Sequence, residues 1–273
     1  MNNGNPSLGE IISAIEAFAH PGLQESWDNT GWQLLPVSPD TECSGVLSCL
    51  DVTPVVVDEA IAEGCNLIIS HHPLIFKGLR HITGVTEGEH AVIRALQAGV
   101  SIYSSHTALD SAPQGVSHRL GLMLGLVDMT VLSPQPSADP SAPQTGLGIV
   151  GTFPSPMTRE ALIADVKTVY GSPVVRCSAG PYTSAPIRKL ALCSGSGGEF
   201  IPAAIAAGAD AYITSDTRYH DFVDFGKRIF IIDTGHFESE KCTKSIFSSI
   251  ISEKFPNFAV RMSRTEQNPV NYI

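Results

Sequence analysis

The sequence predicts an α/β protein built from two similar lobes with mainly parallel sheets. Three observations favour this fold class: short apolar segments alternate with amphipathic helical segments, the order of these segments repeats in the second half, and a proline-rich stretch separates the halves. The chain has 273 residues, of which 43% are hydrophobic and 16% are charged. This length and composition suit two lobes that each bury a core.

The first half begins with an apolar run at residues 45–50, which is typical of a buried strand. Residues 53–63 predict a helix, because apolar and acidic positions alternate there with helical spacing. A strand over residues 66–70, a helix over 89–98 and a strand over 100–104 follow. Strands that alternate with helices predict parallel pairing with right-handed crossovers.

The second half repeats this order. Residues 189–193 predict a strand and residues 200–207 predict a helix. Residues 211–214 and 228–232 predict two further strands, with a helical stretch between them. We therefore expect the same strand–helix–strand–helix–strand unit in both lobes.

The two halves also share sequence. Residues 60–72 align with residues 204–216, and five of these thirteen positions are identical. The strands that follow align in the same order, residues 102–107 with residues 229–234. Two matches in the same order favour an internal duplication.

A break in composition predicts the boundary between the lobes. Residues 133–145 contain four prolines in thirteen positions. Proline lacks a backbone N–H and has a fixed φ, so this stretch should be an extended connection and not a helix or an inner strand. We expect a first lobe over residues 1–132, the connection over 133–145, and a second lobe with a C-terminal helix over 146–273.

Charge and composition exclude several classes of protein. With 17 Lys and Arg residues against 27 Asp and Glu residues, the formal net charge is −10, which opposes direct binding to nucleic acid. Neither a signal peptide nor an apolar run of the roughly 20 residues that span a membrane is evident. The six cysteines form no Cys-x-x-Cys pair and mostly lie beside apolar residues, which is typical of reduced, buried thiols. These features predict a cytoplasmic protein without membrane contacts.

Histidines and carboxylates gather where predicted strands end. Ligands of open parallel sheets bind beyond the carboxyl ends of the strands, so residues at these positions should converge. If the two lobes face each other, the site lies in the cleft between them. The polar residues at or just past these ends are His71, His72, His106, Asp216, Asp233 and His236, and Asp110 and Glu240 follow four residues after His106 and His236.

Spacing within these groups carries further expectations. His71 and His72 are adjacent, and in an extended backbone their side chains point in opposite directions. His236 and Glu240 are four residues apart, so a helix that starts there places both on one face. Glu238 would then project elsewhere, and we expect it to be solvated.

The residue types predict a metal site. Imidazole and carboxylate ligands together suit Zn, Mn, Fe, Co or Ni. Five ligands are too many for one tetrahedral ion with an open position, and they suffice for two divalent ions that share a carboxylate. Two such ions can activate water as a nucleophile, as a hydrolase requires. The five expected ligands are His71, His72, Asp110, His236 and Glu240.

Two other segments have two interpretations each. The glycine-rich turn over residues 194–200 follows a strand and opens a helix, so its amides could hold an anion, although such turns are common without a ligand. The segment over residues 27–31 begins with Trp27, which could flank a cleft or serve as a buried anchor.

Six motifs in a fixed order cover nearly the whole chain. They are SWDNTG (26–31), SHHPLIFK (70–77), HTALD (106–110), GSGG (195–198), GADAYIT (208–214) and GHFESE (235–240). This ordered set resembles the NIF-three-like proteins, which are often labelled GTP cyclohydrolase type-two homologues.

The resemblance implies an arrangement of the ions and of the subunits. It implies a dinuclear site in which His72 and Asp110 hold one ion, His71 and His236 hold the other, and Glu240 bridges. It also implies a homo-oligomer, often a hexameric toroid, whose sites face an internal cavity.

Two functional hypotheses follow. The first is a metal-dependent hydrolase acting on a small molecule such as a nucleotide, and the resemblance makes a GTP cyclohydrolase-like activity one form of it. His106 is the candidate catalytic residue, as a proton shuttle or as a group that orients a ligand. The second is a non-enzymatic protein that binds or delivers metal and acts through partners. Turnover separates the two hypotheses, because the same ligands serve both.

Overall fold

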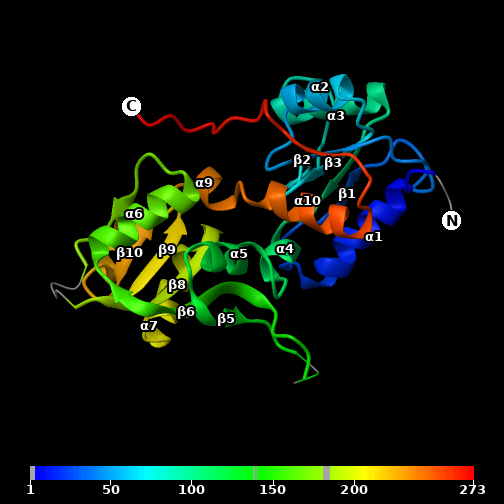
Figure 1. Cartoon of the computed structure of the whole chain (residues 1–273). Coiled ribbons are helices and arrows are strands. Elements are labelled where there is room, and N and C mark those ends of the chain that lie inside the picture. Colours follow the sequence, from blue (N-terminus) through cyan, green and yellow to red (C-terminus); the bar gives the residue numbers. More distant parts are fainter. Residues whose placement is uncertain (1–3, 138, 140, 181–184) are drawn as a thin grey trace. The chain divides into compact units, whose positions relative to one another are not determined.

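Each of two units of the chain forms its own β-sheet (Figure 1). The computed structural model describes residues 4–137, 139, 141–180 and 185–273. One unit contains the chain up to Leu109 together with Lys241–Pro269, and the other contains Asp110–Glu240 together with Val270–Ile273. Both units combine a sheet with helices, which confirms the predicted α/β class.

The sheet of the first unit is mainly parallel, as predicted. Its described strands are β1 (Gly31–Leu34), β2 (Val46–Cys49), β3 (Leu67–Ser70), β4 (Ser101–Ser104) and β11 (Val260–Met262). They lie in the order β1-β4-β3-β2-β11, and only the pair of β1 with β4 is antiparallel among these described pairings. β2, β3 and β4 are buried on both faces, which explains their uninterrupted apolar character.

Helices cover both faces of this sheet (Figure 1). They are α1 (Leu8–Phe18), α2 (Pro54–Ala62), α3 (Glu87–Ala98) and α10 (Thr243–Lys254). α2 and α3 pack together on one face, and α1 and α10 pack together on the other. Leu47, Ile68 and Ile102 project from neighbouring strands into a core that they share with Val56 of α2 and Ala95 of α3.

The predicted helices begin and end at residues with suitable chemistry. Thr53 accepts a hydrogen bond from the amide of Val56 at the start of α2, and Pro54 occupies its first turn. α3 ends at Gly99, whose φ of 67° lies in the left-handed region that glycine tolerates. These local signals explain why both helices were predictable from sequence.

The second unit has a mixed sheet. Its described strands are β5 (Val127–Pro134), β6 (Gly146–Met157), β7 (Arg176–Cys177), β8 (Ile187–Ser196), β9 (Ala211–Ser215) and β10 (Phe230–Asp233). They lie in the order β5-β6-β8-β9-β10-β7. β8, β9 and β10 pair in parallel in chain order, as β2, β3 and β4 do in the first unit.

The expectation of a mainly parallel sheet is wrong for this second unit. Three of its five described strand pairings are antiparallel. The reason is that a hairpin of β5 and β6 extends the sheet at one edge, and the short β7 extends it at the other.

Helices also pack on the second sheet. The helices of this unit include α5 (Val116–Met123), α6 (Arg159–Tyr170), α7 (Ile201–Ala206), α8 (Tyr219–Phe225) and α9 (His236–Glu240). Ala191 and Tyr212 of the sheet form a core with Ile201 and Ala204 of α7. A further short helix, α4 (Thr107–Ser111), contains the boundary between the two units.

The proline-rich stretch does not coincide with the division into units. β5 ends at Pro134, which pairs with Gly146 at the start of β6, so the first two residues of the stretch lie in a strand of a hairpin within the second unit. Positions 138 and 140 of the predicted connection lie outside the described residues. β5 is an edge strand, where a residue without a backbone N–H is tolerated.

The C-terminal part of the predicted second lobe is also reassigned. The chain from Lys241 to Pro269, with α10 and β11, belongs to the first unit. β11 pairs in parallel with β2, from which it is separated by about two hundred residues in the chain. This pairing is non-local, so the local sequence pattern does not reveal it.

Two further expectations were tested by the described residues. None of the helices in that part of the chain is both long enough and apolar enough to cross a bilayer. All six cysteines are free thiols. Cys43, Cys49, Cys65 and Cys193 are buried as expected, whereas Cys177 is exposed.

Candidate metal centre

Three histidines form a tight group in the first unit. His71 and His72 follow β3, and His106 follows β4, which is the neighbouring parallel strand. The ring centroids of His71 and His72 lie 5.2 Å apart, and both lie 5.2–5.4 Å from the ring of His106. One possible ligand atom from each residue lies within 4.8 Å of the other two. The rule that polar residues converge at strand ends is therefore confirmed here.

The expectation that His71 and His72 point in opposite directions is wrong. β3 ends at Ser70, and the backbone bends at both histidines instead of remaining extended. The two rings are consequently neighbours, with an angle of 41° between their planes. Both can face one metal site.

In each of these histidines, Nδ1 lies within hydrogen-bond distance of an oxygen atom. Nδ1 of His72 lies 2.8 Å from Oδ1 of Asp51, and Nδ1 of His106 lies 2.7 Å from Oδ1 of Asp28. Nδ1 of His71 lies 3.0 Å from the carbonyl oxygen of Ser105. Metal-binding histidines typically donate one ring N–H to such an acceptor, which fixes the tautomer and directs the other nitrogen at the ion.

Asp28 is the most enclosed of these acceptors. Its side chain is inaccessible to solvent and accepts hydrogen bonds from the backbone amide and the hydroxyl of Thr107, the first residue of α4. Burial alone would raise the pKa of this carboxyl group, but the hydrogen bonds from His106 and Thr107 hold the pKa well below its usual range. Asp28 therefore remains a carboxylate and locks the orientation of His106.

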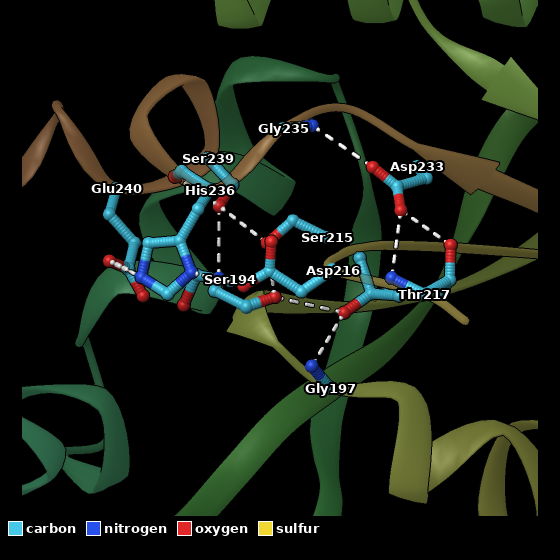
Figure 2. Close-up of polar contacts among 12 residues, drawn as sticks. Ser194, Gly197, Ser215, Asp216, Thr217, Asp233, Gly235, His236, Ser239 and Glu240 are labelled. Carbon is cyan, nitrogen blue, oxygen red and sulfur yellow. Dashed lines mark hydrogen bonds and ion pairs between the residues drawn. The ribbon is translucent and has the colours of Figure 1, made fainter. Parts of the chain in front are cut away.

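In the second unit, His236 and Glu240 face each other on α9. Nε2 of His236 lies 2.8 Å from Oε2 of Glu240, which confirms that the spacing of four places both on one face. Figure 2 shows His236 between Glu240 and Asp216, with Oδ2 of Asp216 2.6 Å from Nδ1 of His236. Asp216 directly follows β9 and has a φ of 54°, a conformation that non-glycine residues rarely adopt outside functional or turn positions.

Glycine at position 195 makes room for Glu240. Gly195 lies near the end of β8 with a φ of 63°, and a Cβ atom there would come 2.0 Å from Oε1 of Glu240. Its amide donates to the hydroxyl of Ser239, the residue before Glu240. The end of β8 is thus matched to α9, and only glycine allows the carboxylate this close approach.

Replacing Gly195 by alanine should displace Glu240 and weaken metal binding about 10- to 100-fold, the usual effect of disturbing groups around a metal ligand. A competition titration with a chelator measures this affinity. Gly208→Ala is the matched control, because Gly208 has a φ of 72° and nothing lies within 4 Å of the added Cβ. Equal losses in the two variants would show that backbone strain, and not the contact with Glu240, is responsible.

Asp110 also lies in the second unit. Ser194 donates a hydrogen bond of 3.4 Å from its hydroxyl to Oδ1 of Asp110, and Ser117 bonds with both the hydroxyl and the amide of Ser194. Burial raises the pKa of the thiol of Cys193, and the charges of Asp110 and Glu240 raise it further.

One expectation about a neighbouring segment needs correction, and the structure favours one of the two interpretations of another segment. Glu238 is buried, at 5% exposure, and not solvated, because α9 is short and its far side also packs within the protein. In the glycine-rich turn, two amides are used within the protein: Gly197 donates its N–H to the hydroxyl of Thr214, and Gly195 donates its N–H to the hydroxyl of Ser239. The interpretation without a ligand therefore fits this turn.

Trp27 is exposed, and is not a buried anchor. Its side chain is 58% exposed, and its ring lies 6.0 Å from that of His106. The interpretation that Trp27 flanks the site therefore fits the structure.

Among the carboxylate acceptors of the histidine rings, the sequence analysis included Asp216 with the strand-end residues but missed Asp51 and Asp28. Asp51 follows β2, so the strand-end rule that identified Asp216 after β9 could have found it too. Asp28 lies in a loop before β1, and no strand-end signal marks it. Asp233, another strand-end carboxylate, bonds to the amides of Thr217 and Gly235 and so joins two loops (Figure 2).

The chain is similar to known proteins over almost its full length. A family model described as Duf34/NIF3 (NGG1p interacting factor 3) matches residues 6–269. A GTP cyclohydrolase 1 type 2 homolog from Clostridium acetobutylicum is 32% identical over 232 residues, which are 85% of this chain and 84% of that protein. Protein NIF3 homolog of Schizosaccharomyces pombe is 31% identical over 245 residues, 88% of this chain and 87% of that protein. A solved structure of a hypothetical protein from Staphylococcus aureus, 27% identical, matches with a TM-score of 0.87 and covers 98% of this chain and 100% of that one.

Proposed function

Because this chain belongs to the Duf34/NIF3 family, we propose that it is a metal-dependent hydrolase that binds two divalent ions and acts on a nucleotide or related small molecule. The observation that carries this proposal is the support given to four histidines. In His71, His72, His106 and His236, Nδ1 lies within hydrogen-bond distance of a carbonyl or carboxylate oxygen. A histidine arranged in this way can offer Nε2 to a metal ion, as we propose for His71, His72 and His236, or to a proton, as we propose for His106.

The donor set fits divalent ions of the zinc and first-row type. Nitrogen from imidazole and oxygen from Asp110 and Glu240 are the ligands that Zn, Mn, Fe, Co and Ni share. We assign His72 and Asp110 to one ion, His71 and His236 to the other, and Glu240 to both. When bound, such ions supply Lewis acidity and make water a better nucleophile near neutral pH.

Residues of the protein would transfer the proton between water and the leaving group. His106 has Nδ1 tied to the buried carboxylate of Asp28, so its Nε2 can accept a proton from water or return one to a leaving group. The negative charge of Asp28 stabilises the imidazolium that forms in between. We therefore propose His106 as the proton-transfer residue and Asp28 as the residue that positions it.

Metal binding by His236 should release a proton at neutral pH. Burial lowers the pKa of His236, but hydrogen bonds to Asp216 and Glu240 dominate and raise it to about 11. Because a metal ion binds the neutral imidazole, the apparent affinity should rise as the pH rises, by up to about tenfold per unit for one released proton. Calorimetric titration with Zn²⁺ in buffers of different ionisation enthalpy counts the protons.

Asp216→Asn is the matched variant for this measurement. It keeps the size of the side chain and removes one of the two charges that favour the imidazolium, so fewer protons should be released at the same pH. An affinity that stays constant from pH 6.5 to pH 8 would contradict the proposed role of His236 as a ligand.

The central experiment combines metal analysis with a turnover assay. Purified protein is dialysed with each candidate metal, its metal content is measured, and it is incubated with a panel of nucleotides, including GTP, and phosphoesters. We expect about two ions per chain and turnover that disappears after chelation. Turnover that survives complete metal removal would contradict the proposal, whereas bound ions without turnover of any compound would favour the non-enzymatic metal-delivery alternative.

Two structural proposals accompany this function. The homo-oligomer expected from the family resemblance, a hexamer, is measured by analytical ultracentrifugation. The shared order of parallel strands in the two sheets supports an origin by duplication. Superposition of β2–β4 on β8–β10 with the connecting helices tests it, and different helix placement would argue against it.

A further inference from the structure

An exposed aromatic pair borders the histidine group of the first unit. Trp27 is 58% exposed and Phe76 is 47% exposed. Their ring centroids lie 6.0 Å apart, and those of Trp27 and Phe76 lie 6.0 Å and 6.3 Å from the ring of His106. Large exposed aromatic side chains that gather at a polar site mark a binding surface.

The backbone that carries both aromatic residues is fixed. Asp28, next to Trp27, is bound to His106 and Thr107. The residue before Phe76, Ile75, donates its amide to Gln33 at 3.0 Å and accepts a hydrogen bond from Asn29 at 2.6 Å. The two aromatic residues are therefore held in place by neighbours that are themselves tied to the site, a geometry typical of a rigid platform for a ligand.

The loop that follows Phe76 adds positive charge. Lys77 and Arg80 are exposed, and neither forms an ion pair with another residue that the structure describes. At its far end the loop is tied to α3, because Glu89 accepts hydrogen bonds from the amides of Thr83 and Val85. In a chain with a formal net charge of −10, two exposed cations without ion pairs on the loop after Phe76 favour an anionic ligand group.

We propose that this surface is the nucleotide-recognition subsite, in which a base stacks on Trp27 and Phe76 while Lys77 and Arg80 bind the phosphate. The inference rests on the proposed function and names its recognition element. Aromatic rings bind any base through its flat face, and cations bind phosphate oxygens. The stacked base would lie beside His106, the proposed proton-transfer residue.

Binding of simple probes to the metal-loaded full chain tests the subsite. The probes are guanosine 5′-monophosphate, ribose 5-phosphate, which lacks the base, and inorganic phosphate. Stacking should make the nucleotide bind at least about tenfold more tightly than ribose 5-phosphate, which corresponds to about 1.4 kcal/mol. Nucleotide binding should also change the fluorescence of Trp27.

Variants distinguish the contribution of the base to binding from that of the phosphate. Trp27→Ala should remove the advantage of the nucleotide over ribose 5-phosphate, and Trp27→Phe should retain most of it. Lys77→Ala should weaken the binding of all three probes to a similar extent. The matched controls are Val223→Ala, an apolar residue exposed to 53%, and the exposed Lys167→Ala, both of which lie in the second unit and should leave binding unchanged.

Several results would overturn the subsite. They are equal binding of nucleotide and ribose 5-phosphate, absence of nucleotide binding, and unchanged nucleotide affinity in Trp27→Ala. A shift in oligomeric state in Trp27→Ala and Phe76→Ala with unchanged nucleotide affinity would show that the pair contacts another copy of the chain. Metal content and turnover of the compound panel are measured in the same preparations. If Trp27→Ala binds ions and hydrolyses its substrate as the parent protein does, the proposed subsite is wrong and the proposed function still stands.

Discussion

Glu240→Gln should reduce the metal content from about two ions per chain to nearly none. Glu240 is buried, at 4% exposure, and its carboxylate contacts His236. In the proposed assignment it serves both ions, so loss of its charge removes a ligand from each and leaves their mutual repulsion uncompensated. Asp110→Asn should instead spare one ion, because Asp110 is assigned to one ion alone. Metal analysis after dialysis measures both variants.

Glu238→Gln is the control for this comparison. Glu238 lies on the same short helix and is also buried, but it is not an assigned ligand, so this variant should keep both ions. A bound ligand stabilises the folded state by about 2.7 kcal/mol at a hundredfold excess over its Kd, so Glu240→Gln should also lose the increase in melting temperature that metal gives the parent protein. Equal metal content in Glu240→Gln and Asp110→Asn would show that the division of ligands between the ions is wrong.

The parallel cores of both sheets were predictable because their signals are local. Strands such as β3 and β9 are buried on every residue, and therefore appear as short apolar runs between helices. Helix starts such as Thr53 and helix ends such as Gly99 have their own chemistry. No knowledge of distant contacts is needed to recognise these features.

The parts that were missed depend on distant pairing. Pro134 resembles a linker residue by composition, and its place on an edge strand becomes clear only once the partner Gly146 is known. β11 spans three residues and owes its existence to pairing with β2. Local periodicity carries no information about which strand lies at which edge.

In the candidate site, too, some residues were predictable from local signals and others depend on distant contacts. The strand-end rule places His71, His72 and His106 together correctly, because parallel neighbours end at one edge of a sheet. It cannot find Asp28, which reaches His106 across 78 positions of the chain from a loop that precedes an antiparallel strand. The contact of Gly195 with Glu240 was likewise invisible, since a missing side chain acts only through what occupies its place.

His106→Gln should retain both metal ions and lower kcat by about 10²- to 10⁴-fold on the panel compound that the parent protein hydrolyses fastest. Glutamine can still form a hydrogen bond with Asp28, but it cannot carry a proton between water and a leaving group near neutral pH. KM should change little, because the variant keeps the bulk of the side chain beside the site. Steady-state kinetics and metal analysis of the same preparation give the two measurements.

Asp28→Asn separates positioning from proton transfer. It removes the buried charge that holds His106 in its orientation, so kcat should fall while the metal content stays at the parent level. His220→Gln, an exposed histidine on α8, is the control and should leave both quantities unchanged. Loss of a metal ion in His106→Gln would contradict the assignment. His106 would then act as a ligand together with His71 and His72, whose ligand atoms lie within 4.8 Å of its own, and the proton would have to be carried by another group.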